Sequence, residues 1–252
     1  MMKDLYQLEK QKIKGRKIGL IVAIVLVIQF VWLLTCFRPP VTESDLADGY
    51  YMILIDLPVL NTIFFPLLIA MIASRICEIE HKGNNLKLLY TMMDRRKLFD
   101  SKFLIGLRYI LLIALIQFIL IFAVAKIVGV TAAPPWFHCI WIPLSCILMN
   151  IVLFLMQEIL SFWFENQMIP LAVGLFGSFF GIMSLFIQQV REISLWASYL
   201  MLGTINMNWD SETRIITYYE LPAPWVKTMG IVAVILLFYT AGKWFVIDKK
   251  EV

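Results

Sequence analysis

Six long apolar stretches alternate with polar segments along the 252-residue chain. The stretches cover residues 18–37, 51–73, 103–128, 136–160, 168–187 and 226–247. Each runs for about 20 residues or more, which is the length that a helix needs to cross a hydrocarbon layer of about 30 Å. The pattern therefore predicts six transmembrane helices.

The composition agrees with a membrane location. Hydrophobic residues make up 61% of the chain and charged residues 16%, whereas soluble domains are about 45–50% apolar and about 25% charged. The stretch 18–37 is too long for the apolar region of a signal peptide, and no small-residue cleavage site follows it. We therefore expect an all-α integral membrane protein whose first span is retained.

The polar segments divide the chain into parts with different expected roles. Residues 1–17 form a basic amphipathic segment, 18–247 form the six-span domain, and 248–252 form a short tail. Within the six-span domain, 74–102 is the longest polar interruption on one side of the membrane and 188–225 is the longest on the other. These two segments are the expected contacts with molecules outside the bilayer.

The basic residues predict the orientation. Sixteen of the 22 lysines and arginines fall in three places, with six in 1–17, seven in 74–102 and three from residue 243 onwards. Short loops that are rich in lysine and arginine stay in the cytoplasm. We therefore expect both termini and the segment 74–102 on the cytoplasmic side. The loop 161–167 should lie on the same side, although it has no basic residue.

The segment 74–102 has a helical pattern of its own. Apolar side chains recur on one helical face at Ile76, Ile79, Leu86, Tyr90 and Met93. Gly83 interrupts the pattern, and Asn85 is a suitable N-cap for a short helix over 86–93. A cytoplasmic helix with an exposed apolar face requires a soluble partner, because the face would otherwise promote aggregation.

Motifs for enzyme chemistry are missing from the sequence. There is no HExxH or GxSxG pattern and no glycine-rich loop that could cradle phosphate groups. The four cysteines show no paired metal-ligand spacing. We therefore expect no catalytic residue, no metal site and no cofactor bound by this chain.

Four polar side chains inside the predicted spans are candidates for a substrate path: Asp56, Asn61, Gln117 and Asn150. A second interpretation assigns the amides to interhelical hydrogen bonds of about 1 kcal/mol or less each. Asp56 lies near the outer end of its span and could simply reach water. The sequence leaves both interpretations open.

Aromatic residues alternate with charges in the outer segment 188–225. We expect short interfacial helices there that cap the outer mouth of a dimer, with Trp196 and Trp209 on the path of a departing substrate. The alternative is that these side chains only anchor the segment among lipid headgroups.

Small residues recur along the fifth span at Gly174, Gly177, Ser178 and Gly181. They include two small-xxx-small pairs, which let another helix approach closely. The ridge therefore predicts tight helix packing, either within the chain or between subunits.

The run Glu-His-Lys-Gly-Asn-Asn-Leu-Lys-Leu-Leu, residues 80–89, follows the second span and leads to the third. It resembles the first cytoplasmic loop of ABC transporter type-2 permeases, and more narrowly the lantibiotic-immunity permeases. The likeness in hydropathy covers 18–247, whereas the likeness in residues is confined to about thirty positions around this run. It implies a type-2 exporter-like fold with six helices and a coupling helix between spans 2 and 3.

The resemblance also implies a contact with a separate ATPase subunit, which would bind ATP and Mg. In that family the coupling helix docks in a groove of the ATPase, and the loop after span four makes a smaller contact. The corresponding residues here are Leu86, Leu89, Tyr90 and Met93, with Glu80 and Lys87 at the rim, and Glu165 and Asn166 in the second loop. Leu86 stands where the family often has an aromatic residue, which affects the fit to a particular ATPase.

The function implied is that of the permease subunit of a bacterial ABC exporter in the cytoplasmic membrane. It would expel an antimicrobial peptide, a lantibiotic, and so give self-protection or resistance. The expected partners are an ATPase dimer, a second six-span permease or a second copy of this chain, and lipid, but no nucleic acid. One alternative is a type-2 exporter for another peptide antibiotic or a lipid-linked molecule. Another is a membrane anchor or assembly subunit that does not transport.

Overall fold

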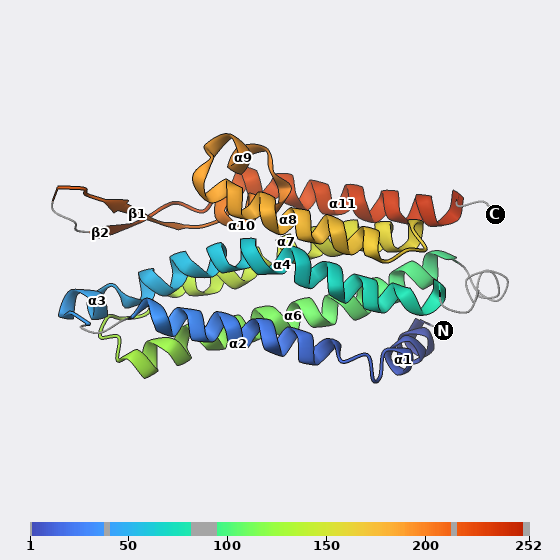
Figure 1. The fold of residues 1–252 in the computed structure, drawn as a ribbon, viewed down its shortest axis with the longest axis horizontal. Coiled ribbons are helices and arrows are strands. Elements are labelled where there is room, and N and C mark those ends of the chain that lie inside the picture. The colour runs from blue at the N-terminus through green and yellow to red at the C-terminus, as the bar shows by residue number, and fades with distance from the viewer. Residues whose placement is uncertain (1, 38–40, 82–94, 213–215, 249–252) are drawn as a thin grey trace.

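Six long helices form the bundle in the computed structural model, which describes residues 2–37, 41–81, 95–212 and 216–248. They are α2 (Ile18–Cys36), α4 (Gly49–His81), α6 (Arg95–Val128), α7 (Trp136–Trp163), α8 (Met168–Phe186) and α11 (Trp225–Asp248). All six run along the long axis of the molecule (Figure 1). Within the described residues, these six helices are long and apolar enough to cross a membrane. The predicted helical six-span architecture is confirmed.

Two of the helices are much longer than a membrane is thick. α4 has 33 residues and α6 has 34, so each measures about 50 Å at 1.5 Å per residue. The hydrocarbon layer is only about 30 Å thick. The ends of α4 and α6 therefore project beyond the hydrocarbon layer and make up part of the polar segment 74–102. Ile76 is buried in this projecting part. The predicted short helix over 86–93 lies outside the described residues.

Shorter helical elements flank the bundle. They are α1 (Met2–Lys12), α3 (Glu43–Ala47), α9 (Gln188–Ile193), η1 (Leu195–Ala197) and α10 (Ser198–Met201). α1 lies at the end of the bundle that also holds both termini, and α3 lies at the opposite end (Figure 1). α3 begins with a capping box, in which the side chains of Thr42 and Asp45 each accept a hydrogen bond from the other residue's backbone N–H. This reciprocal cap stabilises a helix of only five residues.

A β-hairpin follows α10 and differs from the sequence prediction, which named only short helices in 188–225. β1 (Ile205–Trp209) pairs antiparallel with β2 (Ile216–Glu220), and Ile205 lies opposite Glu220. The hairpin projects past the bundle at the end away from the termini (Figure 1). Its strands read INMNW and ITYYE, and β-branched and aromatic residues favour extended chain.

α4 is the central helix and packs against α2, α6, α7 and α8. A proline inside a helix removes the hydrogen bond to the carbonyl four residues earlier, and for Pro66 that carbonyl belongs to Thr62. Gly181 of α8 packs against this oxygen so closely that a Cβ atom would collide with it. α8 thus approaches α4 at the part of the helix that the proline has altered.

Large apolar side chains remain exposed around the bundle. Examples are Leu20 on α2, Leu115 on α6, Phe176 on α8 and Leu236 on α11. α11 is the least buried of the six long helices. An apolar surface of this extent belongs in contact with lipid or with another subunit.

Candidate functional site

The end of the bundle that holds both termini is the candidate functional site, and we call it the terminal end. It contains α1, the end of α4, the start of α6 and the loop between α7 and α8 (Figure 1). His81 and Arg95, which flank the predicted coupling segment, both lie there. The predicted docking residues Leu86, Lys87, Leu89, Tyr90 and Met93 lie outside the described residues.

A buried lysine organises the terminal end. The ammonium group of Lys102, on α6, is completely buried. It donates hydrogen bonds to Glu9 Oε2 at 2.9 Å, to Glu80 Oε1 at 3.0 Å and to the carbonyl of Ile76 at 3.0 Å. A lysine has three N–H donors. Every donor of this buried cation therefore has an acceptor.

A second lysine completes the cluster. Lys12 of α1 lies 2.7 Å from Glu9 Oε1 and 2.9 Å from Glu80 Oε1. Two buried carboxylates thus meet two ammonium groups, and the cluster carries no net charge. Its members come from α1, α4 and α6. Removal of one partner from a buried ion pair costs about 3 to 5 kcal/mol, because the remaining charge is left uncompensated.

The cluster fixes the ends of the two helices that lead into and out of the coupling segment. Glu80 lies one residue before the end of α4, and Lys102 lies two turns after the start of α6. Nearby, Arg16 adds an ion pair of 2.7 Å between its guanidinium and Glu78 of α4. A force applied to either helix end would therefore be transmitted to the other and to α1.

Glu80 differs from its predicted position. It was expected at the exposed rim of the docking helix, but its side chain is buried and ion-paired. The reason is that α1 folds over the end of α4 and brings Lys12 beside it. Glu80 therefore acts inside the terminal end and does not offer its carboxylate to an external partner.

Sequence reasoning did not single out Glu9, Lys12 or Lys102. A signal was present in α1, where Glu9 falls between Tyr6 and Ile13 on the apolar face of the helix. A buried carboxylate is stabilised by pairing with a cation, and the structure contains this arrangement, with Glu9 bound to Lys102 and Lys12.

α7 contributes polar groups of a different kind to the same half of the bundle. Gln157 and Glu158 are buried, yet among the described residues neither oxygen of Glu158 and neither polar atom of the Gln157 amide has a hydrogen-bond partner. Buried polar groups of this kind are rare in folded proteins and cost about 1 to 3 kcal/mol each, or more when charged. In this conformation the two residues form a buried polar site whose hydrogen-bonding groups are unsatisfied within the described residues.

A cleft of about 530 Å³ lies between α4 and the α7–α8 loop. Its lining includes Arg75 and Glu78 from α4, and Glu165 and Asn166 from the loop. Asn166 accepts a hydrogen bond from the backbone N–H of Met168 at 3.0 Å and so caps α8. Glu165 and Arg75 are exposed. The structure thus brings the predicted second contact beside the end of α4.

The intramembrane amides form a closed cluster. Gln117 donates from Nε2 to Asn61 Oδ1 at 2.6 Å and to Gln29 Oε1 at 3.0 Å. Gln29 in turn donates to Asn61 Oδ1 at 2.9 Å. All three side chains are buried and come from α2, α4 and α6. These contacts are interhelical hydrogen bonds, and they leave no open surface along a path.

The other two candidates for a substrate path lie elsewhere. Asn150 accepts a hydrogen bond from the hydroxyl of Tyr199 at 2.6 Å and donates to Cys146 Sγ at 3.2 Å. Asp56 accepts from the thiol of Cys36 at 2.8 Å. The four predicted residues thus occupy three separate places, and only Asn61 and Gln117 are brought together.

Trp196 and Trp209 are also separate. Trp196 packs over Gly177, with its ring stacked on Phe180 at a centroid distance of 5.9 Å. Trp209 is exposed on β1. The two side chains therefore do not form one surface.

The small-residue ridge of α8 packs inside the chain. Gly174 meets Ala70 and the carbonyl of Pro66 on α4, and Gly177 meets Trp196. Ser178 is also buried. The ridge thus serves contacts between α8, α4 and η1 within one subunit.

At the opposite end, which we call the hairpin end, one polar group ties β2 to the bundle. The carboxylate of Glu220 accepts a hydrogen bond from the hydroxyl of Tyr51 at 2.7 Å and lies 3.2 Å from His138 Nε2. His138 Nδ1 is also 2.8 Å from the hydroxyl of Thr204. The Tyr51 and His138 hydrogen bonds hold the pKa of Glu220 below its usual value.

The comparisons with known proteins identify a family. The family model described as ABC-2 family transporter protein matches residues 5–181. No curated protein and no solved structure matches the chain. The matched region begins in α1 and ends in α8, so it contains the Lys102 cluster and the cleft beside Glu165. With its six membrane-spanning helices, the chain belongs to the ABC-2 family of transporter proteins, as a multi-pass transport subunit whose family implies an ABC ATPase as partner.

Proposed function

We propose that this chain is the permease subunit of a bacterial ABC exporter that expels a lantibiotic from the cytoplasmic membrane and so confers resistance. The family membership supports transport and an ATPase partner. The proposal that the substrate is a lantibiotic rests on the resemblance of residues 80–89 to lantibiotic-immunity permeases. Both termini are placed in the cytoplasm because most of the basic residues are concentrated at the terminal end.

The observation that carries the mechanism is the Lys102 cluster. It joins α1, α4 and α6 at the point where the chain enters and leaves the segment 82–94. A coupling helix in that segment would push on two helices that are locked to each other. Movement of the ATPase would then shift α4 and α6 together, and α4 contacts α2, α7 and α8 along the bundle.

The α7–α8 cleft supplies the second contact in this proposal. Arg75 and Glu165 are exposed there with opposite charges, so a partner with mixed charges could be recognised at its rim. Rim charges change association rates and specificity more than total affinity. The apolar anchors at Leu89 and Tyr90 would supply most of the docking energy, about 1 to 3 kcal/mol each.

The bundle interior does not offer the substrate a route, because the amide cluster is closed. We therefore place the substrate path on the lipid-facing surface of the bundle, where a second permease subunit would meet this one. An apolar groove of about 260 Å³ lies there between α2, α4 and α8, lined by side chains that include Phe64, Leu67 and Phe179. An amphipathic peptide within the bilayer could reach such a groove sideways.

The test replaces Leu89 and Tyr90 with serine in cells that carry the ATPase and the second permease. Insertion and expression should stay unchanged, whereas resistance and co-purification of the ATPase should both be lost. The matched control replaces Met207 and Ile216, which are exposed on the hairpin, with serine and should retain the ATPase. A Leu89 and Tyr90 double variant that still holds the ATPase and gives full resistance would refute the coupling role.

The substrate is tested separately by challenge. Cells with the intact transporter should survive a lantibiotic at concentrations that kill a deletion strain, and should gain nothing against antimicrobial peptides without lanthionine bridges. Protection against the second group alone would establish a different peptide exporter. Resistance that is unchanged by deletion would favour the non-transporting anchor.

A further inference from the structure

A basic cavity of about 620 Å³ lies between α1, the turn after it and α6, outside the Lys102 cluster. Its lining residues are Gln7, Lys10, Gln11, Ile13, Lys14, Gly15, Lys17, Ile18, Gly19, Arg108 and Tyr109. Among the described side chains that line the cavity, four are cationic and none is acidic. The proposed export function does not use this cavity.

The two faces of α1 explain its position. Glu9 and Lys12 point into the ion cluster, which fixes the helix on α4 and α6. Gln7, Lys10 and Lys14 fall on the other face and line the cavity. The chain then turns back through Gly15, which has a positive φ of 95°. Glycine adopts this conformation without strain, and the turn closes the cavity against the start of α2.

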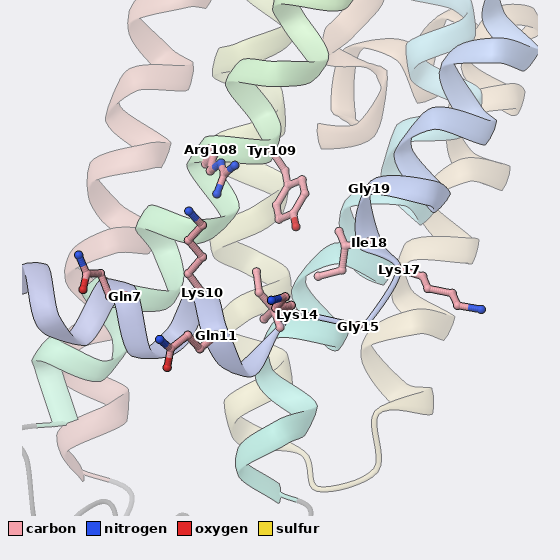
Figure 2. A pocket seen from close by; sticks show the side chains of 11 residues that line it. Gln7, Lys10, Gln11, Lys14, Gly15, Lys17, Ile18, Gly19, Arg108 and Tyr109 are labelled. Carbon is pink, nitrogen blue, oxygen red and sulfur yellow. The ribbon is translucent and has the colours of Figure 1, made fainter.

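Three of the cations that line the cavity have no counter-ion in the part of the chain whose side chains the structure describes. Among the described residues, neither Lys10, Lys14 nor Arg108 has an acidic partner within ion-pair distance. Figure 2 shows the side chain of Lys10 extending from α1 toward the guanidinium of Arg108, with the ring of Tyr109 beside them. Lys17 points away from the cavity in the same view. Like charges that converge on one space repel each other unless an anion lies between them.

The cavity lies at the level where two spans begin. Ile18 is the first residue of α2, and Arg108 of α6 lies near the start of the apolar stretch 103–128. Beyond the cavity, Leu20 of α2 and Leu111 of α6 are exposed apolar side chains. A bilayer has its phosphate groups at this boundary, about 5 to 8 Å outside a hydrocarbon layer of about 30 Å.

We propose that the cavity binds the phosphate headgroup of an anionic phospholipid. Lys10, Lys14 and Arg108 contact the phosphate, and the hydroxyl of Tyr109 is placed to donate a hydrogen bond to it. The acyl chains follow the exposed apolar faces of α2 and α6. Basic pockets beside membrane helices bind anionic headgroups in this way. A bound lipid would also hold α1 on the ion cluster from its outer face.

The test uses the full-length chain in nanodiscs of phosphatidylcholine that contain increasing fractions of phosphatidylglycerol. Native mass spectrometry counts the lipids retained, and thermal unfolding reports their effect. The wild-type chain should retain phosphatidylglycerol in preference to phosphatidylcholine. In the Lys10→Gln and Arg108→Gln double variant this preference should fall about 30-fold, or about fivefold for each cation removed.

Lys17→Gln is the matched control: Lys17 borders the cavity, but its side chain points away from Lys10 and Arg108 (Figure 2), so the variant removes the same charge without removing a proposed phosphate contact. It should keep the wild-type preference. An equal fall in Lys17→Gln would show attraction to the surface charge alone and overturn the site. Displacement of the lipid by millimolar inorganic phosphate would also overturn it, since the occupant would then be a free anion.

A milder variant keeps the test decisive if the double variant does not fold. Lys14→Gln changes one exposed residue and should lower the preference for phosphatidylglycerol about fivefold. An unchanged preference in this folded variant would exclude Lys14 from a phosphate contact and contradict the proposal.

Discussion

The two ends of the bundle use charge in opposite ways. At the terminal end, four charged groups from three helices are largely withdrawn from water and satisfy one another. At the hairpin end, the Glu220 side chain is 53% exposed and contacts Tyr51 and the buried His138. Breaking the contacts at the terminal end therefore costs much free energy. The contacts that hold the hairpin are weak and can break and re-form.

The physical reason for this difference is the local dielectric. An exposed ion pair is screened by water and contributes about 0 to 1 kcal/mol. A buried pair gains little in total, but the loss of one partner leaves a charge that water cannot solvate. This arrangement suits a transport subunit in which the terminal end receives force from a partner. The hairpin end can then change its conformation as the substrate leaves the membrane.

The largest effect is expected at Lys102. Lys102→Met should lower the free energy of unfolding by about 3 to 5 kcal/mol, because Glu9 and Glu80 would then share only Lys12. Lys126→Met removes an exposed lysine from the hairpin end of the same helix and should change stability by less than about 1 kcal/mol. Chemical unfolding in mixed micelles would measure both. Equal losses of unfolding free energy in the two variants would contradict the difference between the two ends.

A second substitution separates charge from packing in the cluster. Glu9→Gln in the Lys102→Met background should recover part of the lost stability, because one carboxylate and one ammonium group would remain. The double-mutant cycle should therefore show a favourable coupling between the two residues. Purely additive losses would mean that the charges of Glu9 and Lys102 do not stabilise each other.

Glu158 should give the next largest effect, with the opposite sign. Glu158→Met should raise the free energy of unfolding by about 1 to 3 kcal/mol, since neither carboxylate oxygen has a hydrogen-bond partner within the described parts of the chain. Glu165→Met changes an exposed carboxylate in the cleft and should have little effect. Thermal unfolding of the two purified variants compares them directly. A loss of stability in Glu158→Met would show that the carboxylate has a partner in the folded protein.

Hydropathy predicted the six spans because a membrane helix is recognised from its own residues. The Lys102 cluster could not be found in this way, since Glu9 and Lys102 are 93 residues apart and each resembles an ordinary surface charge. Glu80 was placed at an exposed rim for the same reason. Burial of a charge depends on which helix covers it, and no local pattern around Glu80 indicates that α1 does so.

The hairpin was missed for a different reason. β1 (INMNW) alternates between apolar and polar residues, but it is only five residues long, and β2 (ITYYE) shows no such alternation. Both strands are largely exposed on both faces, so no buried face reinforces the pattern. The sequence predicts short interfacial helices in 188–225 with Trp209 on the path of the substrate, whereas Trp209 lies on a strand. The docking residues in 86–93 remain a prediction.

The amide cluster tests whether polarity in the middle of the membrane serves packing. Gln117→Leu removes two hydrogen bonds and should cost about 1 kcal/mol, the usual size for such bonds between membrane helices. Transport per folded molecule should stay the same, because the cluster is closed to substrate. A loss of transport at unchanged stability would mean that Gln117 and Asn61 do lie on the substrate path. Resistance measured together with membrane abundance distinguishes these outcomes.

The smallest effect is expected at Glu220, and it depends on pH. The Tyr51 hydroxyl and His138 hold the pKa of Glu220 below its usual value of 4.5. The folded state therefore binds this proton less readily than the unfolded state, so the contact stabilises the hairpin above about pH 4.5 and is lost as the pH falls through the folded pKa. Glu220→Gln does not titrate and should show no such loss. Hydrogen exchange at the amides of β1 and β2, compared between pH 6 and pH 3, should converge for the two proteins at the lower pH. A difference between them that is the same at both values would mean that Glu220 holds the hairpin by its shape and not by its charge, and the contrast with the buried cluster at the other end would then rest on Lys102 alone.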